Sequence, residues 1–154
     1  MITSAINDDK NEIIIIINAN ISSEIIDYRY YNKISQVIVN GEESNIHEYK
    51  NHLKIGENEI NIVLKEKLNN CEYMFNYLSN ILKINLSNFD LSDVENMRYM
   101  FYHCDSLVSL DLSNHNASSV INMEFMFYYC KSLVSLDLRN FNTLCNLYFT
   151  IVIN

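Results

Sequence analysis

The chain has 154 residues, of which 49% are hydrophobic and 19% are charged, and its formal net charge is -8. This composition predicts one folded domain with an apolar core and excludes a disordered linker. The acidic balance, without a cluster of Lys or Arg, argues against binding nucleic acid or anionic lipid through a basic face.

The longest apolar run near the start of the chain covers residues 13–17. It is too short to cross a bilayer, and acidic residues precede it where a signal peptide would need basic ones. We therefore expect neither a membrane-spanning segment nor a signal peptide in this sequence, and we assign the run to a strand.

Two further strands are predicted before residue 67. Residues 34–40 place three apolar residues before an asparagine, a spacing that recurs later in the chain and predicts one rung of a repeat array. Asn40-Gly41 is also a strong hairpin signal, so residues 37–39 could instead pair antiparallel with those after Gly41. Residues 60–64 alternate apolar and polar side chains and predict another strand. Residues 1–67 are thus predicted as a β-rich N-terminal cap.

The second half of the chain contains an internal repeat. The dipeptides Met74-Phe75, Met100-Phe101 and Met126-Phe127 recur with a period of 26 residues. Further residues recur in the same phase: Asn70, Asn96 and Asn122; Cys104 and Cys130; Ile84, Leu110 and Leu136; Leu86, Leu112 and Leu138; Asn88, Asn114 and Asn140. The sequence therefore predicts tandem copies of one structural unit.

Each unit divides into two predicted elements. Met97, Met100, Phe101 and Cys104 stand at i, i+3, i+4 and i+7, which predicts the buried stripe of a short helix. Residues 107–112 alternate with period two, which predicts a strand with its leucines on one face.

A short helix and a short strand repeated in tandem bury their apolar faces only when successive units stack. The predicted fold is therefore an α/β repeat, a leucine-rich-repeat-like solenoid with a parallel strand ladder and short helices. Three units are expected over residues 68–143, and residues 144–154 are expected to form a degenerate or truncated last repeat.

The segments 96–104 and 106–114 resemble the 26-residue repeat of the BspA-like leucine-rich repeat surface proteins, whose units read approximately N-M-x-x-M-F-x-x-C-x-x-L-x-x-L-D-L-S. The resemblance covers residues 68–143. It implies display at the cell surface and adhesion for the bacterial relatives.

Candidates for catalysis are few. Cys71, Cys104, Cys130 and Cys145 lack the spacing of zinc or redox motifs and are expected to be reduced thiols. His103 adjoins Cys104, but neighbouring residues of a helix point about 100° apart, so a Cys–His pair is not expected. We predict a protein that is not an enzyme and that holds no metal or cofactor.

Two surfaces are candidates for binding. The strand face has outward polar positions: Lys83, Asn85, Ser109, Asp111, Ser135, Asp137 and Arg139. Stacked Asp111 and Asp137 would repel each other mildly, and a cation or a basic group of a partner would relieve this. The alternative is a solvated polar face, which any soluble repeat protein needs.

The helix face has aromatic positions outside the buried stripe: Tyr73, Tyr77, Tyr99, Tyr102, His103, Phe125, Tyr128 and Tyr129. Aromatic side chains lose little rotamer entropy on contact and are plausible anchors for another protein. The alternative is that they fill the space between neighbouring helices.

The first functional hypothesis is a non-catalytic repeat protein that mediates protein–protein interaction or adhesion, with no nucleic-acid partner and no membrane insertion. The second is a structural element that assembles with another copy through an open edge at Phe149–Ile153, a segment of high strand propensity.

Overall fold

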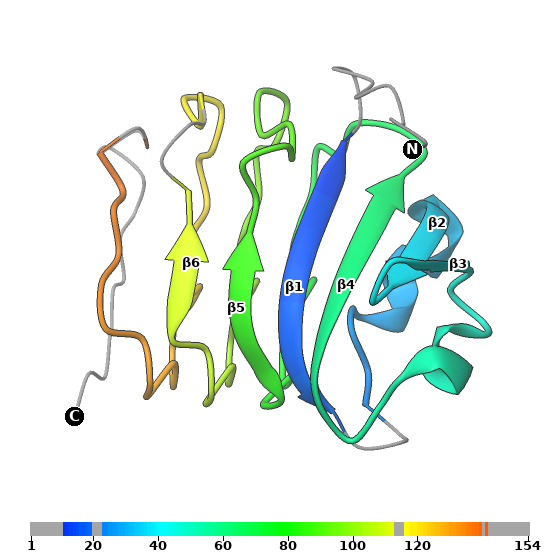
Figure 1. The fold of residues 1–154 in the computed structure, drawn as a ribbon. Coiled ribbons are helices and arrows are strands. Elements are labelled where there is room, and N and C mark those ends of the chain that lie inside the picture. Colours follow the sequence, from blue (N-terminus) through cyan, green and yellow to red (C-terminus); the bar gives the residue numbers. More distant parts are fainter. Residues whose placement is uncertain (1–10, 20–22, 113–115, 140, 142–154) are drawn as a thin grey trace.

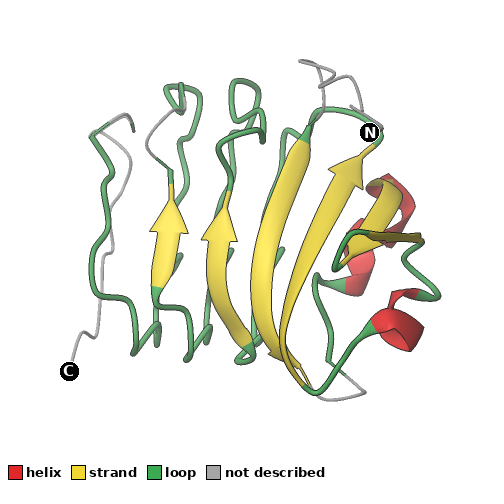
Figure 2. Ribbon diagram, viewed as in Figure 1, coloured by secondary structure: helices red, strands yellow, loops and turns green. Residues whose placement is uncertain are grey.

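The computed structural model describes residues 11–19, 23–112, 116–139 and 141 (Figure 1). A six-stranded mixed sheet, in the order β3-β2-β4-β1-β5-β6, organises this part of the chain. Its strands are β1 (Glu12–Ala19), β2 (Ile34–Val39), β3 (Glu42–Ser44), β4 (Gly56–Leu64), β5 (Ile81–Asn85) and β6 (Ser109–Asp111). Two short 3-10 helices, η1 (Tyr28–Lys33) and η2 (Tyr49–His52), lie near β2 and β3 (Figure 2).

Strand β1 joins the N-terminal region to the repeats. It pairs antiparallel with β4 on one side and with β5 on the other. Its alternate residues Ile13, Ile15 and Ile17 are fully buried, as expected for β-branched residues on the inner face of a central strand. The strands predicted near residues 13–17 and 60–64 are confirmed. Among the six described strands, the parallel pair is β5 with β6.

The alternative left open for residues 34–46 is settled in favour of a hairpin. Asn40 and Gly41 have φ values of 52° and 83°, and Val39 lies opposite Glu42 across the turn. Two successive positive φ values match the twist of a two-residue hairpin, which is why Asn-Gly is favoured there.

The short helices predicted for the repeats are absent from the described residues. The segments around the Met-Phe dipeptides are turns, drawn as loops in Figure 2. Tyr73, Tyr99 and Phe125 have φ values of 61°, 55° and 54°, and these left-handed residues interrupt a right-handed helix.

Hydrogen bonding explains why turns form. Within the first unit, the N–H groups of Met74, Asn76 and Leu78 each donate to the carbonyl three residues earlier. The intervening N–H groups donate to the next unit: Cys71 to Asn96, Tyr73 to Arg98, Phe75 to Met100 and Tyr77 to Tyr102, at 2.8, 3.1, 2.9 and 2.7 Å. The second unit bonds to the third in the same way. In an α-helix every interior N–H donates to the carbonyl four residues earlier, so it cannot also donate to the next unit.

The asparagines that recur 26 residues apart support this stacking. Asn70, Asn96 and Asn122 form parallel backbone bridges with one another. The Oδ1 atom of each accepts the N–H two residues later, at 2.9 to 3.1 Å. This Asx turn precedes the turns of each unit, so the repeated asparagine has a structural role.

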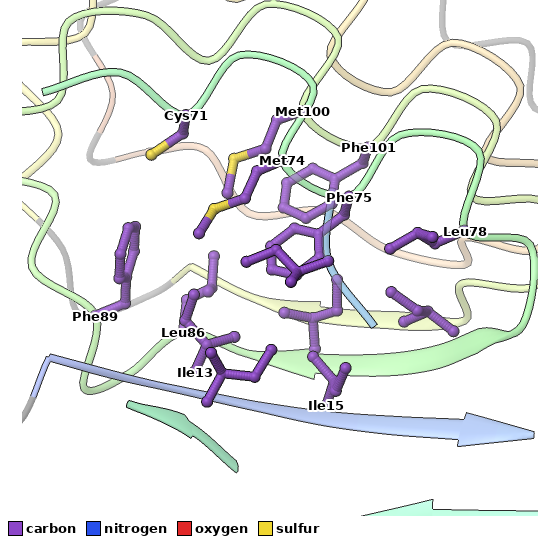
Figure 3. Close-up of a cluster of buried hydrophobic side chains, with 14 of the residues drawn as sticks. Ile13, Ile15, Cys71, Met74, Phe75, Leu78, Leu86, Phe89, Met100 and Phe101 are labelled. Atoms are coloured by element: carbon purple, nitrogen blue, oxygen red, sulfur yellow. The ribbon is translucent and has the colours of Figure 1, made fainter. Parts of the chain in front are cut away.

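The core lies between the sheet and the turns, and Figure 3 shows part of it. Phe75, Phe101 and Phe127 stack through it, with ring centroids 5.6 and 5.5 Å apart. Ile13 and Ile15 of β1 belong to the same cluster as the repeat residues. The predicted regions 1–67 and 68–143 thus share one sheet and one core.

The prediction of a leucine-rich-repeat-like solenoid with short helices is therefore wrong: the fold is a mixed six-stranded sheet backed by stacked turns. The predicted buried stripe is nevertheless buried, since Met97, Met100, Phe101 and Cys104 are all inaccessible. Consecutive four-residue turns bring i, i+3, i+4 and i+7 to one side, as a helix does over two turns. The sequence pattern fixes this burial but not the backbone conformation. The predicted last repeat over 144–154 lies outside the described residues.

Candidate functional site

The eight predicted aromatic positions come together on the turns, not on helices. They form three rows along the direction in which the units stack, and we call this set the aromatic surface. The first row is Tyr73, Tyr99 and Phe125, the middle row is Tyr102 and Tyr128, and the third row is Tyr77, His103 and Tyr129.

The backbone at the outer rows is strained. All six residues of the first and third rows have φ between 54° and 62°. A non-glycine residue in this region costs about 1–2 kcal/mol, and only glycine, asparagine and aspartate adopt it readily. Aromatic residues therefore occupy positions where smaller residues would be less strained, and the bonds between units hold them there. This strain indicates that the rings themselves matter at these positions.

The rings interlock in a herringbone arrangement. Within a row, neighbouring ring planes are 6° to 11° apart and centroids are 4.4 to 5.6 Å apart. Between rows the rings meet edge to face: Tyr102 lies 5.2 Å from Tyr99 at 86° and 4.6 Å from His103 at 72°. Offset stacking and edge-to-face contact are the favourable geometries for aromatic pairs, so the rows support one another.

Charged side chains flank the first row. The Arg29 guanidinium lies 4.7 Å from the ring centroid of Tyr73, and that of Arg98 lies 4.6 Å from the centroid of Tyr99. Arg98 also forms ion pairs with Glu124 at 2.8 Å and with Glu72 at 3.7 Å, so opposite charges alternate across three units. These contacts fix the register of the units as well as the position of the rings.

A similar charged pair flanks the third row. Lys131 Nζ lies 2.9 Å from Asp105 Oδ2 and 5.2 Å from the ring centroid of Tyr129. His103 Nδ1 lies 3.5 Å from Asp105 Oδ1. Charges of both signs therefore border the aromatic surface on two sides.

Most ring faces of the aromatic surface pack on a neighbouring ring or on a cation. Tyr77 is 64% exposed, and the other seven residues are half-buried because their faces pack on one another. A tyrosine phenol is protonated at neutral pH, and desolvation and contact with the Tyr77 phenol raise the pKa of Tyr102 further above its ordinary value. Protonated phenols both donate and accept hydrogen bonds, which suits the surface to polar backbone groups of a protein.

The seven predicted residues of the strand face are also exposed or half-buried. Lys83 lies opposite Ser109, and Asn85 opposite Asp111, across β5 and β6. The predicted repulsion between Asp111 and Asp137 is offset at one end, since Arg139 binds Asp137 at 2.6 Å and lowers its carboxyl pKa to about 2. Ser135, Asp137 and Arg139 lie beyond β6 in a segment without strand geometry. This face has no aromatic anchor among these residues.

His103 and Cys104 do not form a catalytic pair. The Cys104 thiol is buried and donates to the Phe75 carbonyl at 3.0 Å, and burial raises its pKa well above the ordinary value. Cys130 donates in the same way to the Phe101 carbonyl at 3.1 Å. Within the described part of the chain, no three His, Cys, Asp or Glu side chains gather in a group that could hold a metal ion. The repeated cysteines therefore bond one unit to the next.

Three groups at the aromatic surface were missed by the sequence analysis. The row formed by Glu72, Arg98 and Glu124 could have been found, because these residues recur at the 26-residue period with alternating charge. The contact of Arg29 with Tyr73 could not, because 44 positions separate them and no repeat relates them. Asn76 stands in phase with Tyr102 and Tyr128, and the 26-residue period could have shown that it takes the place of a ring in the middle row.

One family model matches this chain. It is described as "Mycoplasma protein of unknown function, DUF285", and it covers residues 44–147, which is 104 of the 154 residues. The chain belongs to this family. The DUF285 match begins at the last residue of β3 and includes every residue of the aromatic surface. Comparison with curated proteins and with solved structures produced no match.

Across the described ranges, no helix has the length and apolar character needed to span a membrane. The segment Phe149–Ile153, expected to pair with another copy, lies outside those ranges and its role stays a prediction.

Proposed function

We propose that this DUF285 protein is a non-catalytic binding module that contacts another protein through the aromatic surface. The observation that carries the proposal is the set of eight rings, held in register by the bonds between units and packed face to face within the rows. Tyrosine contributes a large contact area with few rotatable bonds, and it is enriched where proteins bind one another.

The arrangement favours a protein over a carbohydrate or a nucleic acid. Sugars and bases bind aromatic side chains by stacking on an open ring face. In the rows, neighbouring rings and Arg29 occupy most such faces. Ring edges and phenol groups match the mixture of aliphatic and polar groups on a protein surface.

The resemblance to BspA-like surface proteins adds a biological setting. We propose adhesion to another protein as the role of this contact, with the strand face as the solvated side of the molecule. The strain at the six left-handed positions supports this view, since a purely structural turn would be less strained with glycine or asparagine.

Site-specific crosslinking tests the proposal. A photoreactive phenylalanine analogue would replace Tyr102 on the aromatic surface or, as the control, Ser109 on the strand face, in the source cells. We expect a discrete crosslinked protein from position 102 and none of the same mass from position 109. Crosslinking of the same protein from both positions, or from position 109 alone, would contradict the proposed surface.

The captured protein is then purified and titrated against the intact chain. The double substitution Tyr102→Ser and Tyr128→Ser is expected to weaken binding by at least about tenfold, as for interface hot spots. Tyr102→Phe, which keeps the ring, should change it by less than about threefold. Equal affinity for the wild type and the double variant would refute the proposal.

A further inference from the structure

The middle row of the aromatic surface ends at Asn76. This residue stands 26 positions before Tyr102 and 52 before Tyr128, so it occupies the place that a tyrosine takes in the next two units. In those units the ring touches both outer rows: Tyr102 contacts Tyr99 and His103, and Tyr128 contacts Phe125 and Tyr129. The first unit has the two outer rings, Tyr73 and Tyr77, and no ring of its own between them; Tyr102 of the next unit meets Tyr77 edge to face, with centroids 5.3 Å apart at 72°.

The Asn76 amide is oriented by its own contacts. Its Nδ2 donates to Asp27 Oδ2 at 3.2 Å and to the Tyr73 carbonyl at 2.9 Å. These two acceptors use both N–H groups and fix which end of the amide is the oxygen. Asn76 Oδ1 has no hydrogen-bond donor in the described part of the chain, so a ligand there would find a fixed acceptor.

We propose that a binding partner inserts an aromatic side chain with an N–H or O–H donor, a tryptophan or a tyrosine, over Asn76. The inserted ring would extend the middle row by one position next to Tyr102, and its donor would bond to Asn76 Oδ1. This inference rests on the proposed function and names the group of the partner that the aromatic surface recognises.

The charges around Asn76 favour an aromatic ring over an arginine. Arg29 binds Asp27 through both carboxylate oxygens, at 2.7 and 3.0 Å, so this carboxylate is already neutralised. The same guanidinium lies over Tyr73, the ring beside Asn76. A second guanidinium would meet a like charge there, whereas the face of an aromatic ring attracts cations.

A small aromatic probe tests the inference directly. N-acetyl-tryptophanamide would be titrated into the isotope-labelled full chain and followed by NMR. We expect millimolar binding, with the largest shifts at the Asn76 side-chain amide and at the rings of Tyr73, Tyr77 and Tyr102. The 1-methylindole analogue, which lacks the N–H, should bind at least about threefold more weakly, because one hydrogen bond is lost.

A substitution that fills the position supplies the second arm. Asn76→Tyr should complete the middle row and weaken probe binding at least about tenfold, while Asn51→Tyr, an exposed position on η2, should leave it unchanged. The wild-type titrations with the two probes do not depend on how either variant folds. Three results would overturn the inference. The first is the absence of shifts near Asn76 at N-acetyl-tryptophanamide concentrations well above millimolar. The others are an unchanged probe affinity in Asn76→Tyr and tighter binding of N-acetyl-argininamide than of N-acetyl-tryptophanamide.

The captured protein separates this inference from the proposed function. If Tyr102→Ser with Tyr128→Ser weakens the complex but Asn76→Tyr does not, the inserted ring is refuted and the proposed function stands. If neither change weakens it, both are refuted. Weakening by both changes supports both.

Discussion

Phe101 offers the sharpest test of the stacked units. Its side chain is fully buried, and its ring lies between Phe75 at 5.6 Å and Phe127 at 5.5 Å. Removing a buried phenylalanine ring costs about 3–5 kcal/mol through lost transfer energy and the resulting cavity. Small domains have only about 5–15 kcal/mol of stability, so Phe101→Ala should remove a large part of it.

Phe75→Ala is the matched comparison for the loss of stability in Phe101→Ala. Phe75 is also fully buried, but among the described residues it stacks on Phe101 alone. Each aromatic contact adds about 0.5–1.5 kcal/mol beyond burial, so Phe101→Ala should cost that much more than Phe75→Ala. Urea unfolding followed by tyrosine fluorescence measures both, and Ile55→Ala, at a position 91% exposed, is the control, with an expected change within about 0.5 kcal/mol. A loss below 1 kcal/mol for Phe101→Ala, or a larger loss for Phe75→Ala, would refute the stacking.

Three more outcomes are expected. Leu110→Asp should abolish the cooperative unfolding transition because it puts a charge on the inner face of β6. Ser109→Ala, on the outer face, should change the free energy of unfolding by less than about 0.5 kcal/mol. An unchanged melting temperature for Leu110→Asp would contradict the strand assignment. Asn96→Ala should cost about 1 kcal/mol in urea unfolding, because the Arg98 N–H loses its Asx-turn acceptor; no loss would mean that water replaces it fully. Hydrogen bonds from Lys67 and Ser92 lower the pKa of Asp90 to about 2 from an ordinary value of 3.8. The ionised Asp90 carboxylate therefore stabilises the folded state fully above pH 3.8, and this contribution disappears as the pH falls through 2. Asp90→Asn should lose stability less steeply than the wild type between pH 4 and pH 2 in acid unfolding, and identical slopes would contradict the ion pair.

The sequence predicted much of the burial pattern. The 26-residue period identified the repeated units, the inner face of β6 and the buried Met-Phe positions, because burial follows from side-chain spacing alone. It also located β1 and β4, whose isoleucines alternate with outward residues.

The backbone of the repeats could not be obtained in the same way. Helices and chains of four-residue turns both bring Met97, Phe101 and Cys104 to one side, and what separates them is the partner of each N–H group. That partner lies 25 residues away in the next unit, as for Tyr73 and Arg98. Secondary-structure propensities describe interactions between residues close in sequence, so they do not predict this distant hydrogen-bond acceptor.

The strand order of the sheet could not be predicted from the sequence for a similar reason. The tandem repeat predicted a ladder of parallel strands, but β1 enters between β4 and β5 and runs antiparallel to both. A run of isoleucines predicts a strand and its burial without specifying its neighbours. The eight ring positions of the aromatic surface were predicted, while their herringbone geometry depends on left-handed residues that aromatic side chains seldom occupy.

Binding of a partner protein at the aromatic surface can be measured directly. The most direct measurement is the affinity of the purified, crosslink-identified protein for the wild type and for the Tyr102→Ser, Tyr128→Ser double variant, by isothermal titration calorimetry, with unfolding curves confirming that both are folded. A loss of at least about tenfold in the double variant, with Ser109→Ala unchanged, is the predicted result. Equal affinities for wild type and double variant would contradict binding through the aromatic surface.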